Sequence, residues 1–493
     1  RHERPLYAAM NMMDLQARIG SALEAKRWKG LGPLLTEMGF ADRQRVLINL
    51  KSLHRQEDMR YALPKLLSFC THSPDPDLAF NGFESLASAP GSVLGSLLRD
   101  DRALGTLATA FALSPYFIAL LVRNPHSLRW LFCEGGINVR REGGDFLTAL
   151  RAFVEPMQDF ADLCAKLRRF KEREVLRIGL RDLGGMAPFQ EVAQELSDLA
   201  SACLELACRY CYRMLVGEYG RPLVREPGER MDACGFVILG MGKLGGRELN
   251  FSSDIDLQYL HASDEGETEG GPGLDGPVRI SCDAFFVKLA ELITRAMGEV
   301  TEEGFVFRTD LRLRPHGKSG KITNSLRGAE FYYESWGDTW ERAALIKARP
   351  VAGEIELGKQ FLQQVEPFVY RRYLDFTAIE EIQGLKQRLE RARTSTRAPF
   401  NLKYMMGGIR EIEFFVQALQ LIYGGKFPVL RESNTIRTLE QLETIGIIRA
   451  EDHQCLREAY VTWRTLEHRV QMVHNEQTYT LPEAPEDLQR LAK

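Results

Sequence analysis

The chain has 493 residues, of which 44% are hydrophobic and 27% charged, so we expect a soluble globular protein of two to four domains with ample core. Its formal net charge of -3 gives no reason to expect non-specific binding to nucleic acid. Nine scattered cysteines fit a reducing cytoplasm, and the longest apolar run, 106–122, is interrupted by Ser114 and Pro115 and is too short to span a membrane.

The first part of the chain, residues 1–150, is predicted to form a helical domain. Apolar residues recur there at helical spacing, as at Leu31 and Leu34. We expect the helices of the long apolar run to break at Ser114-Pro115, because the residue before a proline disfavours helical backbone angles. Helix packing is the interpretation we prefer for this domain, since nothing in its chemistry suggests catalysis.

The helical pattern continues to about residue 217 and includes a long amphipathic stretch, 190–214, which we expect to pack against the sheet of the next domain. Cys208 and Cys211 lie three residues apart on this predicted helix. Because no second C-x-x-C motif accompanies them, a zinc or redox site is disfavoured, and we interpret both as buried thiols.

An apolar, β-branched run, Phe236–Leu239, predicts a buried strand that leads into a glycine-rich loop. The loop holds Gly240, Gly242, Lys243, Gly245 and Gly246. A second strand opens with Asp254-Ile255-Asp256-Leu257, and because strand side chains alternate between faces, Asp254 and Asp256 point the same way. Two carboxylates one pleat apart make a hard-oxygen site of the kind that holds Mg²⁺.

The glycines also spell G-x-G-x-x-G, the dinucleotide-binding fingerprint, but that motif is weak by itself. A dinucleotide-binding unit needs a crossover helix of about a dozen residues before its next parallel strand. Only seven residues lie between Gly246 and Asp254, so this interpretation is disfavoured. What remains is a loop whose N–H groups and Lys243 would cradle phosphates.

After an acidic, glycine-rich loop over 262–277 and a predicted helix over 283–300, the segment Phe305–Pro315 alternates with period two. As a strand, it would place Arg308, Asp310, Arg312 and Arg314 on one face and apolar residues on the other. A solvated charged face is the simpler interpretation. A lone aspartate among three arginines also suits phosphate oxygens together with one more metal ligand.

The rest of the chain is again predicted to be helical, with a bundle over 346–493. Trp336 and Trp340 are expected one turn apart on one helix and packed in the core. Lys347 and Arg349 either face a substrate phosphate or stabilise the end of that helix.

The glycine-rich loop, S-D-I-D and a later strand aspartate resemble the site of polymerase-β-type nucleotidyltransferases. The longer motifs GMGKLGGRELNFSSDIDL, FRTDLRLRPHGKSG, WERAALIKARP and GGIREIEFFVQALQL are similar, in family order, to the bifunctional glutamine synthetase adenylyltransferase/adenylyl-removing enzymes. This resemblance extends from about Leu113 to the C-terminus. It implies a mainly α chain in which an α+β nucleotidyltransferase domain with a small mixed sheet, 151–345, is flanked by helical domains at 1–150 and 346–493.

The family's site implies roles for residues at matching positions. Asp254, Asp256 and Asp310 are expected to be catalytic and to bind two Mg²⁺ ions, with Mn²⁺ as an alternative. The nucleotide and phosphate ligands are expected among Gly242, Lys243, Gly245, Gly246, Ser252, Ser253, Arg312 and Arg314. The loop departs from the usual polymerase-β pattern, because a glycine-lysine-glycine sequence replaces Gly-Ser.

The family's complete polypeptide carries two nucleotidyltransferase halves, whereas this chain has a single G-x-G-K…S-D-x-D and looks like one half. Asn250–Asp256 resembles the N-terminal, adenylyl-removing half. The implied reaction is phosphorolysis of adenylyl-tyrosine on glutamine synthetase, giving ADP and unmodified enzyme in the control of nitrogen assimilation. The PII signalling protein, glutamine and 2-oxoglutarate are the implied effectors, with neither nucleic acid nor membrane as a partner.

Three alternatives stay open. The half could instead adenylylate glutamine synthetase from ATP with the same metal site. A small-molecule nucleotidyltransferase is disfavoured, because large helical flanks suit a protein substrate better. A catalytically silent helical regulatory or binding module is disfavoured by the three intact aspartates, Asp254, Asp256 and Asp310.

Overall fold

The computed structural model describes residues 14, 17–225, 231–273, 276–371, 380, 383–384, 386–387, 391 and 400–492. The chain divides into two compact units. Unit 1 comprises Arg1–Arg140, Arg173–Pro188 and Leu466–Lys493, and unit 2 comprises Arg141–Glu172 and Phe189–Thr465. Because the units are defined by contacts between residues, two unit boundaries fall inside helices, one in α11 (Phe160–Leu183) and one in α22 (Ala450–His474). The division into 1–150, 151–345 and 346–493 stays a prediction.

Unit 1 is helical in its described part, as predicted for the first domain. Its α-helices outside α11 and α22 are α2 (Leu31–Glu37), α3 (Arg43–His54), α4 (Glu57–Arg60), α5 (Leu63–Thr71), α6 (Pro76–Ser88), α7 (Asp101–Leu113), α8 (Pro115–Arg123), α9 (His126–Leu128) and α23 (Pro485–Ala492). The predicted break is confirmed, because Ser114 separates α7 from α8 and its hydroxyl accepts the N–H of Phe117 at 3.1 Å.

Unit 2 holds the strands. These are β1 (Pro222–Arg225), β2 (Met231–Ala233), β3 (Phe236–Gly240), β4 (Ile255–His261), β5 (Glu267–Thr268), β6 (Thr309–Asp310), β7 (Thr323–Ser325) and β8 (Arg349–Gly353). Its helices are α10 (Gly143–Val154), α12 (Phe189–Tyr219), α13 (Gly242–Gly245), α14 (Cys282–Gly298), α15 (Leu326–Trp336), α16 (Thr339–Ile346), α17 (Ile355–Gln364), α18 (Glu366–Val369), α20 (Ile409–Tyr423) and α21 (Thr435–Thr444).

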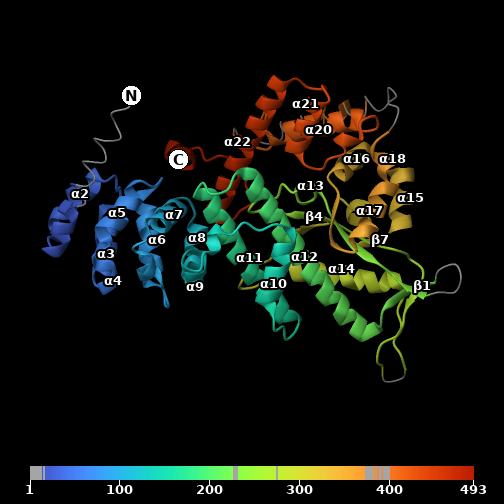
Figure 1. The fold of residues 1–493 in the computed structure, drawn as a ribbon, viewed down its shortest axis with the longest axis horizontal. Helices are drawn as coiled ribbons and strands as arrows, with labels where there is room; N and C mark the ends of the chain where they lie inside the picture. The colour runs from blue at the N-terminus through green and yellow to red at the C-terminus, as the bar shows by residue number, and fades with distance from the viewer. Residues whose placement is uncertain are drawn as a thin grey trace. The chain divides into compact units, whose positions relative to one another are not determined.

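The larger sheet runs in the order β6-β4-β3-β8, with β7 also paired to β4. Figure 1 labels β4 and β7 of this sheet. β3 pairs antiparallel with β4 and with β8, whereas β6 and β7 pair parallel with β4. The antiparallel pairing of β3 with β4 confirms that the glycine motif does not open a dinucleotide-binding unit, which requires parallel strands.

Both faces of β3 are covered, which explains why its sequence is apolar without alternation. Val237 and Leu239 belong to a buried cluster with Tyr333 of α15 and Phe361 of α17. On the other face Phe236 stacks on Phe286 of α14, with ring centroids 5.4 Å apart. The predicted mainly α architecture with an α+β part and a small mixed sheet is confirmed.

Two local predictions are wrong. The segment Phe305–Pro315 is not one strand, because only Thr309–Asp310 pairs and a turn follows. Trp336 and Trp340 lie on different helices, and Trp336 is 71% exposed. The helices separate because Asp338 caps the N-terminus of α16.

Cys208 and Cys211 are buried in α12 as free thiols, as interpreted from the sequence. Within the described ranges, no helix has the length and apolar composition that a membrane span needs.

Candidate active site

Three aspartates meet at one end of the larger sheet. β6 pairs parallel with the start of β4, and the register places Asp310 beside Asp256. Asp254 directly precedes β4. Burial raises the pKa of Asp256 to about 6, and the negative charges of Asp310 and Asp254 contribute to the rise. The three carboxylates are therefore close enough to interact electrostatically.

Arginines neutralise two of these carboxylates. Nε of Arg308 lies 2.6 Å from Oδ1 of Asp254, and Nε of Arg312 lies 2.7 Å from Oδ2 of Asp310. Burial opposes ionisation of Asp310, but the hydrogen bonds from Arg312 hold its pKa below the ordinary value. Among the residues that the structure describes, Asp256 has no such side-chain partner.

This donor set fits a divalent cation with a preference for oxygen. Three carboxylates converge, and burial and the charges of Asp310 and Asp254 raise the pKa of the central one, Asp256, more than the charges of Lys403 and Arg312 lower it. Mg²⁺ takes oxygen ligands of this kind, commonly one or two carboxylates together with substrate phosphates. Arg312, whose side chain is 65% exposed, is placed to leave Asp310 for a ligand.

Gly242 makes room for the central carboxylate. Its φ is +52°, and a Cβ there would lie 2.8 Å from Oδ2 of Asp256. Only glycine adopts this conformation at little cost while leaving that space open. The glycine at this position of the predicted loop is therefore explained by the site itself.

Gly245 and Gly246 stabilise the helical turn of α13 through their backbone groups. Their N–H groups donate to the carbonyls of Met241 and Gly242, at 3.1 and 3.0 Å. A Cβ on Gly245 would lie 1.6 Å from the backbone oxygen of Lys347. Close backbone packing thus accounts for glycine here, and phosphate binding by these two residues stays a prediction.

The serines and Lys243 have neighbours within the protein. Ser252 and Ser253 are buried, and both the Oγ and the backbone oxygen of Ser252 accept from Arg308, at 3.3 and 2.9 Å. Burial alone would raise the pKa of Glu413, but cations including Lys347 and Lys243 lower it to about 2. Lys243 thus lies close to a buried carboxylate of α20 that the sequence did not single out.

Arg314 binds the backbone of the loop in which it lies, 311–321. Its guanidinium donates to the carbonyl oxygens of Leu311, Gly320 and Lys321, at 2.8, 3.0 and 2.9 Å. These bonds end the alternation expected of a strand, because the chain turns back on itself after Asp310. Anion binding by Arg314 stays a prediction and would compete with these bonds.

A buried polar network anchors the segment between α13 and β4. Nζ of Lys347 lies 2.5 Å from Oε2 of Glu248, and the other oxygen of that carboxylate accepts the N–H of Thr435 at 2.6 Å. Arg464 donates to the backbone oxygen of Glu248 at 2.5 Å, and Arg349 donates to the carbonyl of Gly245 at 3.2 Å. Lys347 and Arg349 therefore support the site from within the protein.

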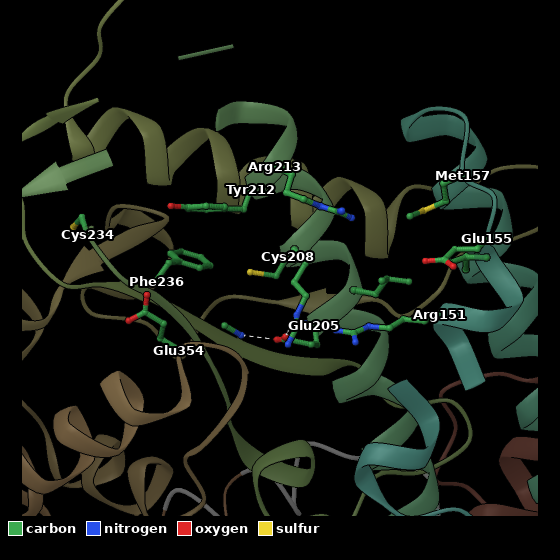
Figure 2. A pocket seen from close by; sticks show the side chains of 14 residues that line it. Arg151, Glu155, Met157, Glu205, Cys208, Tyr212, Arg213, Cys234, Phe236 and Glu354 are labelled. Carbon is green, nitrogen blue, oxygen red and sulfur yellow. Dashed lines mark hydrogen bonds and ion pairs between the residues drawn. The ribbon is translucent and has the colours of Figure 1, made fainter. Parts of the chain in front are cut away.

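The aspartates do not line a described pocket of about 560 Å³ that lies elsewhere in unit 2. Figure 2 shows this pocket beside α12, with Cys234 and Phe236 near the start of β3 and Glu354 after the end of β8. The Glu205 carboxylate on its wall accepts the N–H of Gly353 at 2.8 Å. Because the aspartates lie at the opposite end of β3, the pocket and the candidate site are separate.

Sequence reasoning missed the partners that neutralise and support the site. Arg308 was grouped with arginines suited to phosphate oxygens, whereas it pairs with Asp254, and the charge of Lys403, which lowers the pKa of Asp256, was not considered. Lys403 lies four residues before GGIREIEFFVQALQL, a motif of the family resemblance that begins at Gly407, and that closeness is the signal by which it could have been found.

Two protein-family models match parts of the chain. Residues 104–364 match a protein-family model described as glutamate-ammonia ligase adenylyltransferase. Residues 378–493 match a second model, described as PII-uridylyltransferase.

Individual relatives cover most of the chain. A bifunctional glutamine synthetase adenylyltransferase/adenylyl-removing enzyme of Thioalkalivibrio sulfidiphilus is 38% identical over 419 residues, which cover 85% of this chain and 41% of the relative. A protein of the same name from Pseudomonas aeruginosa is 40% identical over 382 residues, covering 77% of this chain and 38% of the relative. The chain thus spans about two fifths of the length of these relatives. It belongs to the glutamate-ammonia ligase adenylyltransferase family.

Proposed function

We propose that this chain is an enzyme that removes AMP from the adenylylated tyrosine of glutamine synthetase by phosphorolysis. The observation that carries the proposal is the convergence of Asp254, Asp256 and Asp310, fixed by the parallel register of β4 and β6. The names of the relatives support the protein substrate. The sequence of Asn250–Asp256 resembles that of the adenylyl-removing half, which favours removal over addition of AMP.

In the proposed reaction an oxygen of inorganic phosphate attacks the α-phosphorus of the adenylyl group. The bond from that phosphorus to the tyrosine oxygen breaks, the phenolate takes a proton, and ADP leaves. Tyrosine is a fair leaving group, because the pKa of its hydroxyl is about 10. Such a transfer needs positioning and charge neutralisation more than covalent help from the protein.

The residues of the site divide this work. Asp254, Asp256 and Asp310 would hold Mg²⁺, or Mn²⁺, which when bound supplies positive charge to the phosphate oxygens. Arg312, exposed and hydrogen-bonded to Asp310, is placed to bind the attacking phosphate once Asp310 turns to the metal. Lys243 and Gly242 begin the short helix over the same end of the sheet and are proposed as phosphate ligands.

Regulation belongs to the same proposal. The match of residues 378–493 to a PII-uridylyltransferase model supports a response to the PII signalling protein. Glutamine and 2-oxoglutarate are proposed as effectors by family resemblance, and the reaction is proposed to take place in the cytoplasm. Adenylylation of glutamine synthetase from ATP is the nearest alternative, since the relatives carry both activities in their name.

Incubation of the chain with adenylylated glutamine synthetase and Mg²⁺ is expected to release ADP only when inorganic phosphate is present. Chromatography of the nucleotide products measures this release. A parallel reaction with unmodified glutamine synthetase and ATP is expected to incorporate no AMP. Incorporation there would contradict the direction of transfer, and loss of AMP without phosphate would contradict phosphorolysis.

Replacing Gly242 with Ala is expected to slow the reaction by about ten- to a hundredfold, because the added Cβ displaces Asp256 from its neighbours. The strained φ should also cost about 1 kcal/mol of stability. Gly217→Ala on α12 is the matched control, since a Cβ there meets nothing within 4 Å. Turnover numbers and denaturant unfolding of both variants test this, and equal rates in the two would refute the steric argument.

A further inference from the structure

A second group of metal-ligating side chains lies at the other end of β4. His261 is the last residue of β4, Asp264 follows in the next loop, and Asp283 lies in the first turn of α14. One ligand atom from each lies within 4.8 Å of the other two. Because a strand rises about 3.3 Å per residue, this group is about 16 Å along β4 from Asp256.

The hydrogen bonds around His261 assign its ring proton. The Thr323 hydroxyl donates its only hydrogen to the backbone oxygen of Tyr259, at 3.2 Å. Its oxygen therefore accepts from the Nδ1–H of His261, 3.1 Å away. In the neutral imidazole, Nε2 is then left as an acceptor.

This Nε2 faces another acceptor. It lies 3.4 Å from Oδ1 of Asp264, within salt-bridge distance but without a hydrogen bond to any residue in the described ranges. The His261 side chain is fully buried, with 0% exposed. The Asp264 side chain is 53% exposed, whereas Nε2 is buried, so the imidazole lone pair that faces this carboxylate oxygen needs a proton or a metal cation as its partner. The unpartnered, buried Nε2 therefore points to a ligand independently of the carboxylates.

The spacing favours a metal over a shared proton. Tetrahedral ligands about 2.0–2.1 Å from a zinc ion lie about 3.3 Å from one another. This edge matches the 3.4 Å between Nε2 of His261 and Oδ1 of Asp264. A charge-assisted hydrogen bond would draw the same atoms to about 2.7–2.9 Å.

Neighbouring side chains orient the ligands. Thr323 and Ser325, both on β7, hold Nδ1 of His261 and Oδ2 of Asp264. A hydrogen bond to the other ring nitrogen fixes the orientation of a metal-binding histidine and determines which nitrogen carries the free electron pair. Asp283 is 31% exposed and accepts from Nζ of Lys321 at 3.1 and 3.2 Å.

We propose that His261, Asp264 and Asp283 form a binding site for a divalent transition-metal ion such as Zn²⁺, with water completing its coordination. A donor set of one imidazole nitrogen and two carboxylates suits Zn²⁺, whereas the all-oxygen set of the active site suits Mg²⁺. In the metal-free protein Lys321 supplies the positive charge beside Asp283. Because the Lys321 side chain is 61% exposed, it swings into solvent when the metal binds. The site does not depend on the proposed reaction.

The test measures Zn²⁺ binding after chelator treatment, by competition with a chromophoric chelator, in the Asp256→Asn background so that the active-site carboxylates bind less. Asp283→Asn is expected to weaken Zn²⁺ binding by more than about tenfold. Lys321→Met, which removes the competing cation, is expected to tighten it by about two- to fivefold. Both residues are partly exposed, so neither variant endangers the fold.

Two further measurements separate this site from adventitious binding. Co²⁺ in place of Zn²⁺ is expected to show the visible absorption of a four-coordinate ion, lost in His261→Gln. Glu356→Gln, which removes an exposed carboxylate of α17, should leave affinity and spectrum unchanged. Zn²⁺ affinity that is equal in Asp283→Asn and its parent, or Lys321→Met that binds no tighter, would overturn the site and leave a protonated His261 as the explanation.

Discussion

Replacing Asp256 with Asn is expected to abolish AMP removal while making the metal-free protein more stable at pH 8. The rate should fall by at least about a hundredfold, because the central carboxylate of the site is lost. The stability gain follows from the raised pKa of about 6, which shows that ionised Asp256 is unfavourable in the folded chain without metal. The variant should therefore keep its fold while it loses turnover.

The stability difference between Asp256→Asn and the parent should depend on pH. A carboxyl group whose folded pKa is raised stabilises the fold at pH values below its unfolded pKa, and that contribution is lost as pH rises through about 6. In chelator, the difference in unfolding free energy between Asp256→Asn and the parent should grow from pH 4 to pH 8 and reach on the order of 2–3 kcal/mol. Urea unfolding at several pH values measures it.

Asp452→Asn is the matched control, since Asp452 is a carboxylate on the exposed end of α22 paired with Arg449. It is expected to leave turnover unchanged, and its stability relative to the parent should fall rather than rise from pH 4 to pH 8, because the hydrogen bond from Arg449 lowers the pKa of Asp452. Normal turnover in Asp256→Asn would refute the role of the three aspartates. A flat pH profile would instead show that Asp256 is not buried among like charges.

Local patterns predicted the parts of this site that one segment determines. Alternation placed Asp254 and Asp256 on one side of a strand, and the short spacing from Gly246 to Asp254 excluded a parallel crossover. Ser114-Pro115 marked a helix boundary because both residues act on their immediate neighbours. In each case the physical constraint acts within a few residues, where the sequence records it directly.

Long-range pairing was beyond these patterns. The strand expected over Phe305–Pro315 stops at Asp310, because Arg314 binds carbonyls of its own loop instead of continuing the alternation. The register that sets Asp310 beside Asp256 joins residues far apart in the chain. No periodicity records such a register, and only the family resemblance linked the two positions.

The group at His261 had no sequence signal. Asp264 follows His261 by three residues, but it lies in an acidic loop where a further carboxylate is no signal, and Asp283 lies on the later helix α14. Thr323, which assigns the ring proton, comes from β7. Sites assembled across strands in this way are visible only once the strands are paired.

Replacing Lys347 with Met is expected to cost about 3–5 kcal/mol of stability, the largest loss predicted for this chain. Lys347 and Glu248 are 7% and 2% exposed, and their charged atoms lie 2.5 Å apart. Within the described residues, removing the lysine leaves a buried carboxylate that retains the N–H and hydroxyl of Thr435 as hydrogen-bond donors and no ion-pair partner. Denaturant unfolding of the purified variant measures the loss.

The double variant Glu248→Gln/Lys347→Met is expected to recover a large part of that stability. The introduced glutamine is neutral, and its side-chain oxygen would still accept the N–H of Thr435, so position 248 carries no uncompensated charge. Buried Glu413 also loses the charge of Lys347 but keeps those of Arg410, Lys243 and Arg464, so the recovery is not complete. Lys359→Met on α17 controls for loss of a lysine, because its pair with Glu356 is exposed and should contribute no more than about 1 kcal/mol. A double variant as unstable as the single one would show that shape, rather than charge, holds this segment against the site.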